Sequence, residues 1–351
     1  MQYDKRIKYW LWIGLAMVLI QVLIGGITRL TDSGLSITEW ELVEGIVPPM
    51  TEEAWEEAFD LYKTAAKTQY ERLHADMSLS EFKWIYFWEW IHRFWARFMG
   101  LVFVIPLLYF ASRSMIDRSL RNHLIVVFLF AASAGIFGWF MVASGLNNDD
   151  RTWVNAYNLI SHLFIAACTV SAIYWTLLFV RTPQNRIKKH RGFHRLLMLL
   201  IFLLVIQFLW GGLMAGMRAG LLHPHWPFFV QAESFYAALD QQTLLTRENW
   251  MDYEPAVSVK AAVQLGHRIM AYVVAIFSLF LAHRLYHHYF DHRIRAISIR
   301  IAIFVLIQFV LGVLTVLLSI GSIPVFWGVI HQFFAFLLLL AILKAKFYIR
   351  S

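Results

Sequence analysis

Apolar residues in this chain come in long blocks that polar loops separate. Each block has roughly 17 to 25 residues, the length that an α-helix needs to cross a bilayer. The blocks predict eight membrane-spanning helices, at Trp10–Ile27, Ile85–Phe110, His123–Ala143, Asn158–Val180, His194–Ala215, Lys260–Ala282, Ile297–Leu318 and Val325–Ala345. The expected fold class is therefore all-α, and the chain is expected to be a polytopic membrane protein.

Composition agrees with this prediction. Of the 351 residues, 59% are hydrophobic and 15% are charged, whereas soluble domains carry about 25% charged residues. The net charge of +8 does not indicate a nucleic-acid partner, because the basic residues lie in short loops between apolar blocks. The only cysteine, Cys168, cannot form an internal disulfide. No cleavage site follows the short basic N-terminus, so the first block is expected to remain as a helix.

The basic loops also predict the orientation of the helices. Lysine and arginine gather before the first block, after every even-numbered block and at the C-terminus. With an even number of spans these residues all lie on one side of the membrane, and positively charged loops mark the cytoplasm. We therefore expect a protein of the bacterial inner (plasma) membrane with both termini in the cytoplasm.

Two long segments, residues 28–84 and 217–259, fall on the outer side. Bulky and small apolar residues recur at helical spacing in the first segment: Trp55, Phe59, Tyr62 and Ala66. This pattern predicts an amphipathic helix over 51–73 on the outer surface, with Thr51 as its cap. Whether the helix is a lid or a membrane anchor is left open. The second segment is mixed in composition and predicts no element.

The chain repeats its plan once. A glutamine, a glycine pair and a Gly-Leu pair return at constant spacing in the second half: Gln21, Gly25-Gly26 and Gly34-Leu35 match Gln207, Gly211-Gly212 and Gly220-Leu221. Each half has four spans, an even number, so both halves have the same orientation. We expect two pseudo-symmetric four-helix bundles, over residues 1–187 and 188–351, with sites at corresponding places in the two halves.

Four of the fourteen histidines lie near the outer ends of the even-numbered blocks: His92, His162, His267 and His331. Because these blocks run in the same direction, the four rings are expected at similar depth. A single buried histidine is usually a hydrogen-bonded core residue. Four of them, paired by the repeat, favour metal ligation. Most other histidines lie at block ends, and the outer-loop pair His223 and His225 lacks a third ligand.

The expected metal centre is haem. The blocks offer no further set of histidines, cysteines or carboxylates that would complete a four-coordinate zinc site, whereas haem iron takes only axial ligands from the protein. We expect one haem between His92 and His162 and another between His267 and His331. Three nearby arginines could pair with haem propionates or with lipid phosphates: Arg93, Arg97 and Arg268.

One difference between the halves indicates catalysis. Glu89 lies three residues before His92, whereas Gln264 lies three residues before His267. The two side chains have nearly the same shape, but only the acid can transfer a proton. We expect the first half to be the reaction chamber and the second half to hold a haem that passes electrons. The alternative is that Glu89 only forms an ion pair with Arg93.

These residues resemble the haem A synthase family over nearly the whole chain. The most specific stretches are Gly25–Thr31, Ser33–Trp40, Glu89–Arg93, Ala219–Leu221, Gln264–Tyr272 and His331-Gln332. The resemblance implies eight spans in two halves. It also implies conversion of haem O to haem A for cytochrome oxidase, by two hydroxylations of the C8 ring methyl and loss of water to give a formyl group.

The resemblance also implies roles for individual residues. His92 and His162 flank the chamber for haem O and haem A, Glu89 is the essential acid, and His267 and His331 ligate a haem b. Some members of the family carry cysteine pairs in the outer loops, and this chain resembles the members without them. Haem O synthase, the farnesyltransferase that makes the substrate, is a plausible partner, and the electron-transfer partner is unknown.

Two other functions fit parts of the pattern. A non-catalytic two-haem b-type cytochrome that exchanges electrons with quinone explains the histidines. It leaves the difference between Glu89 and Gln264 unexplained, and it predicts haems at two depths. A haem carrier would need haem only in the first half. Because bis-histidine iron has no free position for oxygen, the reaction requires either that one ligand leaves or that the haem is oxidised and attacked by water.

Overall fold

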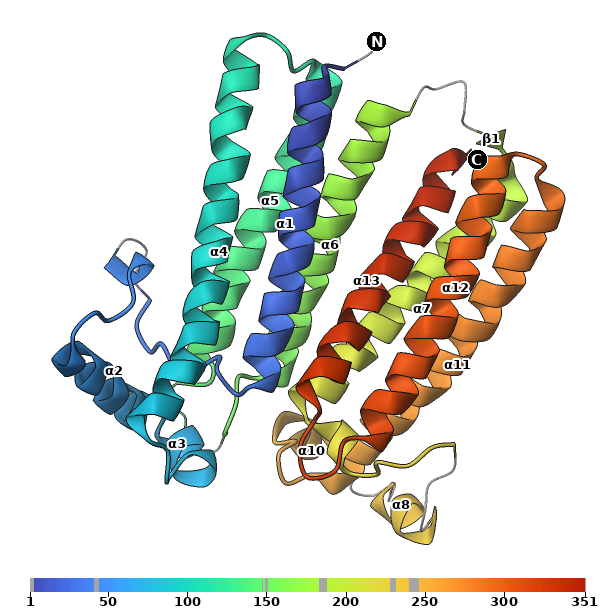
Figure 1. The fold of residues 1–351 in the computed structure, drawn as a ribbon. Helices are drawn as coiled ribbons and strands as arrows, with labels where there is room; N and C mark the ends of the chain where they lie inside the picture. Colours follow the sequence, from blue (N-terminus) through green and yellow to red (C-terminus); the bar gives the residue numbers. More distant parts are fainter. Residues whose placement is uncertain are drawn as a thin grey trace. The chain divides into compact units, whose positions relative to one another are not determined.

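The computed structural model describes residues 3–40, 44–146, 148, 151–182, 188–227, 232–239 and 246–350. Among them, eight helices are long and apolar enough to cross a membrane. They are α1 (Lys5–Leu30), α4 (Leu79–Ser112), α5 (Arg118–Ala143), α6 (Ala156–Arg181), α7 (Arg191–Gly216), α11 (Val257–His288), α12 (His292–Leu317) and α13 (Val325–Tyr348) (Figure 1). The prediction of an all-α, multi-pass membrane protein is confirmed.

Short elements lie in the connections. They are η1 (Glu44–Ile46), α2 (Glu52–Ala65), α3 (Lys67–Leu73), β1 (Lys188–Lys189), η3 (Ala219–Leu221), α8 (Ala232–Ala238), α10 (Arg247–Met251) and β2 (Ile349–Arg350). The two short strands pair in parallel, with Lys188 opposite Ile349. The predicted outer segment 217–259 therefore contains three short helical elements among its described residues.

Capping side chains extend some helices beyond the apolar blocks. α4 begins at Leu79, earlier than the predicted Ile85, because Ser78 and Glu81 form a capping box. The Ser78 hydroxyl accepts from the Glu81 amide at 3.4 Å, and the Glu81 carboxylate accepts from the Ser78 amide at 2.8 Å. These bonds satisfy first-turn amides that have no partner within the helix. A window of hydrophobicity does not detect such a polar first turn.

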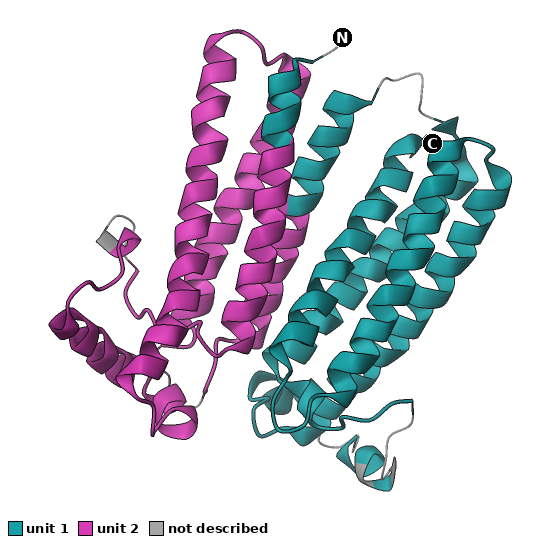
Figure 2. Ribbon diagram, in the orientation of Figure 1, with its two compact units in different colours: residues 1–11, 170–351 teal, residues 12–169 magenta. Residues whose placement is uncertain are grey.

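The chain divides into two compact units, which Figure 2 shows in different colours. The N-terminal unit comprises residues 12–169, and the C-terminal unit comprises 1–11 and 170–351. The last turns of α6 belong to the C-terminal unit, where the ring of Trp175 lies 5.0 Å from that of Phe347. The division at 187/188 expected from the sequence stays a prediction.

Four helices of the C-terminal unit close into a bundle. α11 packs on α7 and α12, and α13 packs on α12 and α7. Each of the four contributes buried side chains to the centre, including Leu200, Leu281, Ile301 and Phe336. This closure places the faces of α11 and α13 that carry His267 and His331 within one bundle.

In the N-terminal unit, polar side chains of one helix reach backbone carbonyls of the next. The Thr28 hydroxyl of α1 donates to the Trp88 carbonyl of α4 at 3.0 Å, and the Trp95 indole of α4 donates to the Met17 carbonyl of α1 at 2.9 Å. Without water in the surrounding lipid, such groups need partners inside the protein. The bonds fix the register of α4 against α1.

The segment between α1 and α4 packs on the beginning of α4. Thr51 caps α2 as predicted, since its hydroxyl accepts from the Ala54 amide at 3.2 Å. The expected single helix over 51–73 is interrupted at Ala66, where φ is −107° and ψ is 37°, so it consists of α2 and α3. We call residues 51–74 the cap.

The cap buries its apolar face within the N-terminal unit. Phe59 and Tyr62 pack with Phe82 at the start of α4, and Leu35 and Val154 belong to the same buried cluster. The Phe59 and Phe82 rings are stacked with centroids 4.8 Å apart. The apolar face is therefore buried against protein and is not available to lipid, and the position of the segment on the outer side stays a prediction.

Hydrogen bonds anchor the cap to the connections next to it. The Tyr62 hydroxyl bonds to Gln69 Oε1 at 3.1 Å and to His74 Nδ1 at 2.6 Å. Gln69 in turn donates to the Asp32 carbonyl at 3.3 Å, just after α1. Burial raises the pKa of Tyr62 well above its usual range, so the hydroxyl remains protonated and can serve as a donor.

Candidate functional site

Each of the four predicted histidine ligands faces a glycine of the preceding long helix. A Cβ added to the glycine would lie 3.1 Å from His92 at Gly25, 3.3 Å from His162 at Gly138, 3.4 Å from His267 at Gly211 and 2.9 Å from His331 at Gly312. A methyl group would displace the ring at Gly312 and press on it at Gly25 and Gly138, whereas at Gly211 it would lie at van der Waals contact. Glycine therefore lets each ring approach the backbone of the neighbouring helix closely.

The two histidines of the C-terminal unit have the separation that one shared metal ion requires. The ring centroids of His267 and His331 are 6.4 Å apart, with the planes at 76°. Imidazole nitrogens bind metal ions at about 2 Å, so rings on opposite sides of one ion have centroids about 6 Å apart. The pair thus fits a haem iron with two axial histidines. Among the residues that the structure describes, no group of three metal-ligating side chains forms an alternative site.

The two histidines of the N-terminal unit also lie against glycines of neighbouring helices. His92 on α4 lies against Gly25 of α1, and His162 on α6 lies against Gly138 of α5. All four long helices of this unit therefore contribute to the chamber around the predicted pair, and a flat iron macrocycle fits the donor set.

Glutamine side chains lie beside both histidines of the C-terminal unit. The Gln207 amide nitrogen is 3.2 Å from Nδ1 and 3.5 Å from Nε2 of His267. The Gln308 amide nitrogen is 3.2 Å from Nδ1 and 3.3 Å from Nε2 of His331. Sequence reasoning missed this role, although a signal was present: each glutamine precedes the facing glycine by one helical turn.

Glu89 is the buried acid of the N-terminal unit, with 2% of its surface exposed. Its Oε1 pairs with an Arg93 guanidinium nitrogen at 2.5 Å. Its Oε2 accepts from the Ser36 hydroxyl and from the Ile37 amide, both at 2.8 Å. The ion pair that the sequence offered as an alternative is present, and two donors of the connection after α1 join it. Together these donors hold the carboxylate one turn from His92.

Arg93 ties the same connection to α4. Its guanidinium donates to the Ile37 carbonyl at 2.7 Å and to the Glu39 carbonyl at 2.8 Å, and it lies 5.0 Å from the centre of the Trp40 ring. A contact with a haem propionate would have to share the guanidinium with these groups. Arg97 lies one turn further along α4 and is half-buried.

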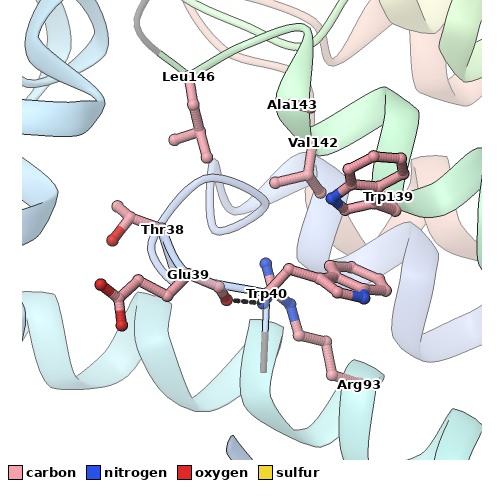
Figure 3. Close-up of a pocket in the computed structure, with 8 residues that line it drawn as sticks. All are labelled: Thr38, Glu39, Trp40, Arg93, Trp139, Val142, Ala143 and Leu146. Carbon is pink, nitrogen blue, oxygen red and sulfur yellow. Dashed lines mark hydrogen bonds between the residues drawn. The ribbon is translucent and has the colours of Figure 1, made fainter. Parts of the chain in front are cut away.

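A cavity of about 230 Å³ opens beside this cluster (Figure 3). It is lined by Thr38, Glu39, Trp40, Arg93, Trp139, Val142, Ala143 and Leu146. Val142 follows Gly138 by one turn of α5, and Arg93 follows His92 directly. The cavity therefore adjoins the predicted chamber at the end where the cap and the connection after α1 lie.

The C-terminal unit has a matching arrangement without an acid. Gln264, which is completely buried, donates to the His223 carbonyl at 2.9 Å, and Arg268 donates to the same oxygen at 2.9 Å. His223 is as far along the chain from Gly211 as Ile37 is from Gly25. Burial, followed by the charge of Arg268, lowers the pKa of His223 below its usual range.

The connections that receive these side chains share two backbone features. Asp32 after α1 and Arg218 after α7 both have positive φ, at 63° and 50°. In the first turn the Ser36 amide donates to the Ser33 carbonyl, and in the second the Leu222 amide donates to that of Ala219. Positive φ is uncommon outside glycine, so its occurrence at matching positions supports the internal repeat.

Comparison with known proteins agrees with these features. The family model described as Cytochrome oxidase assembly protein (COX15-CtaA) matches residues 8–343. A protein named Heme A synthase from Flavobacterium psychrophilum is 38% identical over 341 residues, which cover 97% of this chain and 96% of the relative. Proteins of the same name from Flavobacterium johnsoniae and Brucella ovis are 38% and 32% identical. These alignments cover 96% of this chain in both cases, with 96% and 90% of the respective relatives. The chain therefore belongs to this family of cytochrome oxidase assembly proteins, in which the heme A synthases are oxidoreductases of heme A biosynthesis.

Proposed function

We propose that the chain converts haem O to haem A by two successive hydroxylations of the C8 methyl group, followed by dehydration to a formyl group. The substrate lies in the N-terminal unit between His92 and His162. The observation that carries this proposal is Glu89, a buried acid one turn from His92. The corresponding position in the C-terminal unit holds the neutral Gln264.

The groups around Glu89 prepare it for proton transfer. Each hydroxylation replaces a methyl hydrogen by a hydroxyl group and removes two electrons, so protons move at the chamber whether the oxygen comes from water or from O₂. Arg93, the Ser36 hydroxyl and the Ile37 amide hold both carboxylate oxygens in place. Positioned acids and bases accelerate such steps by about 10²- to 10⁴-fold. Glu89 is the group assigned to accept and return these protons.

The C-terminal unit is assigned to a resident haem b. His267 and His331 would hold it, and their ring separation of 6.4 Å supports this role. When bound, a haem of this kind carries one electron at a time. Arg268 is the basic side chain beside this site, where the predicted propionate contact would share it with the His223 carbonyl.

The membrane placement completes the proposal. We assign the protein to the bacterial inner membrane with both termini in the cytoplasm, because the loops rich in lysine and arginine all fall on one side. Haem O is apolar, so direct transfer from haem O synthase is the proposed route of delivery. The cap and the cavity of about 230 Å³ then lie at the outer end of the chamber.

The test is to identify the pigments of the purified full-length protein and of two single variants. We expect haem b together with haem O, haem A or their hydroxylated intermediate in the wild type. His331→Ala should lose haem b selectively, and His92→Ala should lose the other pigments. Haem b alone in both units would instead establish the two-haem cytochrome, and haem confined to the N-terminal unit would establish a carrier.

A further inference from the structure

We propose that Gln207 and Gln308 are positioning residues for His267 and His331. They make the haem of the C-terminal unit a permanent cofactor. The N-terminal unit has alanine at the position of Gln308, so its haem can exchange. This inference rests on the proposed haem b site and adds a physical reason why one haem stays while the other turns over.

The first observation is that each glutamine has an unsatisfied polar atom next to a ligand ring. The amide nitrogens of Gln207 and Gln308 lie closest to Nδ1 of their histidines, at 3.2 Å in both cases. The Oε1 atoms of both side chains are buried and have no hydrogen-bond partner among the described residues. Buried polar atoms almost always have a partner, so these two oxygens are suited to a donor that arrives with a ligand.

Haem ligation supplies that donor. A histidine that binds a metal ion through one ring nitrogen carries its proton on the other, and the protein usually provides an acceptor for it. A half-turn of the glutamine amide exchanges its oxygen and nitrogen with almost no change in shape. After this half-turn, Oε1 accepts the Nδ1–H and Nε2 of the ring remains available to iron. The half-turn thus pairs Oε1 with the ring N–H.

The N-terminal unit differs at the corresponding positions. Gln308 precedes Gly312 by one turn, and the residue one turn before Gly138 is Ala134. The Gln308 amide nitrogen lies 3.2 Å from His331 Nδ1, whereas His162 Nδ1 has no hydrogen-bond partner among the described residues. The glutamine side chain is the difference, because the methyl group of Ala134 cannot accept a hydrogen bond.

Gln21, which matches Gln207, is used differently. Its amide donates to the backbone carbonyl of His92 at 3.1 Å, whereas the amide of Gln207 lies at the ring of His267. The C-terminal unit therefore has two glutamines against its ligand rings. In the N-terminal unit the one matching glutamine binds backbone. Histidine rings that no glutamine side chain holds suit a chamber that receives a substrate haem and releases a product haem.

The experiment measures haem release from the full-length protein in detergent, with apomyoglobin as the acceptor of released haem. Loss of such a supporting contact typically weakens metal binding by about 10- to 100-fold. We expect Gln308→Leu to speed the release of haem b by a similar factor. Gln308→Glu, which keeps an acceptor oxygen at the same place, should retain haem at the wild-type rate. Ser298→Ala, which removes a hydroxyl on the same helix that donates to the Ile294 carbonyl, is the matched control.

The midpoint potential of haem b provides a second readout. An acceptor at Nδ1 makes the imidazole a stronger electron donor and stabilises ferric iron. Gln308→Leu should therefore raise the potential, and Gln308→Glu should lower it. If Gln308→Leu does not fold, Gln207→Leu is measured in the same way against His267. In the N-terminal unit, Ala134→Gln should slow the release of its haem.

The outcomes separate the two proposals. Wild-type release and potential in the leucine variants, with haem b still lost in His331→Ala, would overturn the role of the glutamines and leave the haem b site intact. Haem b that survives both His267→Ala and His331→Ala would overturn the proposed site itself. An unchanged release rate in Ala134→Gln would overturn the explanation for haem exchange in the N-terminal unit.

Discussion

Side chains at matching positions hold the connection after α1 and the connection after α7, but one of these side chains is an acid in the first case and an amide in the second. In each, an arginine of the following long helix donates to the carbonyl at the matching position, that of Ile37 in the first case and that of His223 in the second. Arg93 also donates to the Glu39 carbonyl. The residue one turn before the arginine is Glu89 in one unit and Gln264 in the other. Both side chains are buried.

This comparison bears on why an acid is present at all. Gln264 shows that a neutral amide at this position can hold the connection, since it donates directly to the His223 carbonyl. Fixing the chain does not require a charge, and a buried ion pair is weak evidence for a role in stability. A role of the Glu89 carboxylate in proton transfer therefore explains its presence better than a role in holding the connection after α1.

The largest expected effect is on turnover in Glu89→Gln. The amide keeps the shape of the side chain but cannot accept a proton, so conversion of haem O should fall by about 10²- to 10⁴-fold. The haem b spectrum should remain. Glu81→Gln, the same exchange on the same helix at the exposed capping box, should convert haem O within about twofold of the wild type, as surface changes usually do. Near-normal turnover in Glu89→Gln would leave the ion pair as the only role of the acid.

Removing the arginines should affect stability unequally. Arg93→Met leaves the buried charge of Glu89 without its ionic partner, which costs about 3–5 kcal/mol in buried pairs. Arg268→Met leaves a carbonyl that Gln264 still binds, so the cost should be about 0.5–1.5 kcal/mol. Thermal unfolding in detergent measures both. Adding Glu89→Gln to Arg93→Met should recover much of the loss, and equal losses at the two arginines would contradict the comparison.

Replacing the glycines that face the histidines by alanine should disturb haem ligation. The effect should be largest where the added methyl group would lie closest to the histidine ring. Gly312→Ala places a methyl 2.9 Å from His331 and Gly25→Ala places one 3.1 Å from His92, whereas Gly211→Ala leaves 3.4 Å to His267. Overpacking costs about 1–3 kcal/mol, and the low-spin haem spectrum reports it. Gly135→Ala, where the added atom meets nothing within 4 Å, is the control. A larger effect at Gly211 than at Gly312 would refute the ranking.

The smallest effect concerns pH and His223, which stands at the position that Ile37 occupies in the other connection. The pKa of His223 is lowered by burial and by the charges of Arg268 and His225, so protonation favours the unfolded form. Stability should be complete above the usual histidine pKa of about 6.5 and decline as the pH falls below it. His223→Ile, which copies Ile37, should remove this decline. Melting temperatures at neutral and acidic pH measure this decline. An equal decline in the variant would show that His223 does not cause it.

Much of the fold could be predicted because the membrane imposes it on the sequence. A span must be apolar over a length set by the bilayer, so composition alone locates α1 and the seven other long helices. The ends were less predictable, since α4 begins where Ser78 and Glu81 cap it. The candidate ligands were also accessible, because four histidines inside apolar blocks are costly unless they have a function.

The surroundings of these residues depend on packing that no local pattern encodes. The periodicity of Phe59 and Tyr62 identifies a helical face but not the surface that it meets, and only the structure places that face against Phe82. Ser36 and Ile37 reach Glu89 across more than fifty positions in the sequence. The path of the chain after α1 brings Ser36 and Ile37 to Glu89.

The sequence by itself determined the eight spans, the duplication, the four histidines and the single acid that distinguishes the halves. These features follow from residue type and spacing, because the hydrophobicity and charge of each residue can be read without knowledge of its contacts. The tertiary structure decided which groups surround the acid, how the cap is buried, and which glutamines meet the rings of His267 and His331. Those contacts join distant parts of the chain, and they exist only once the helices have packed.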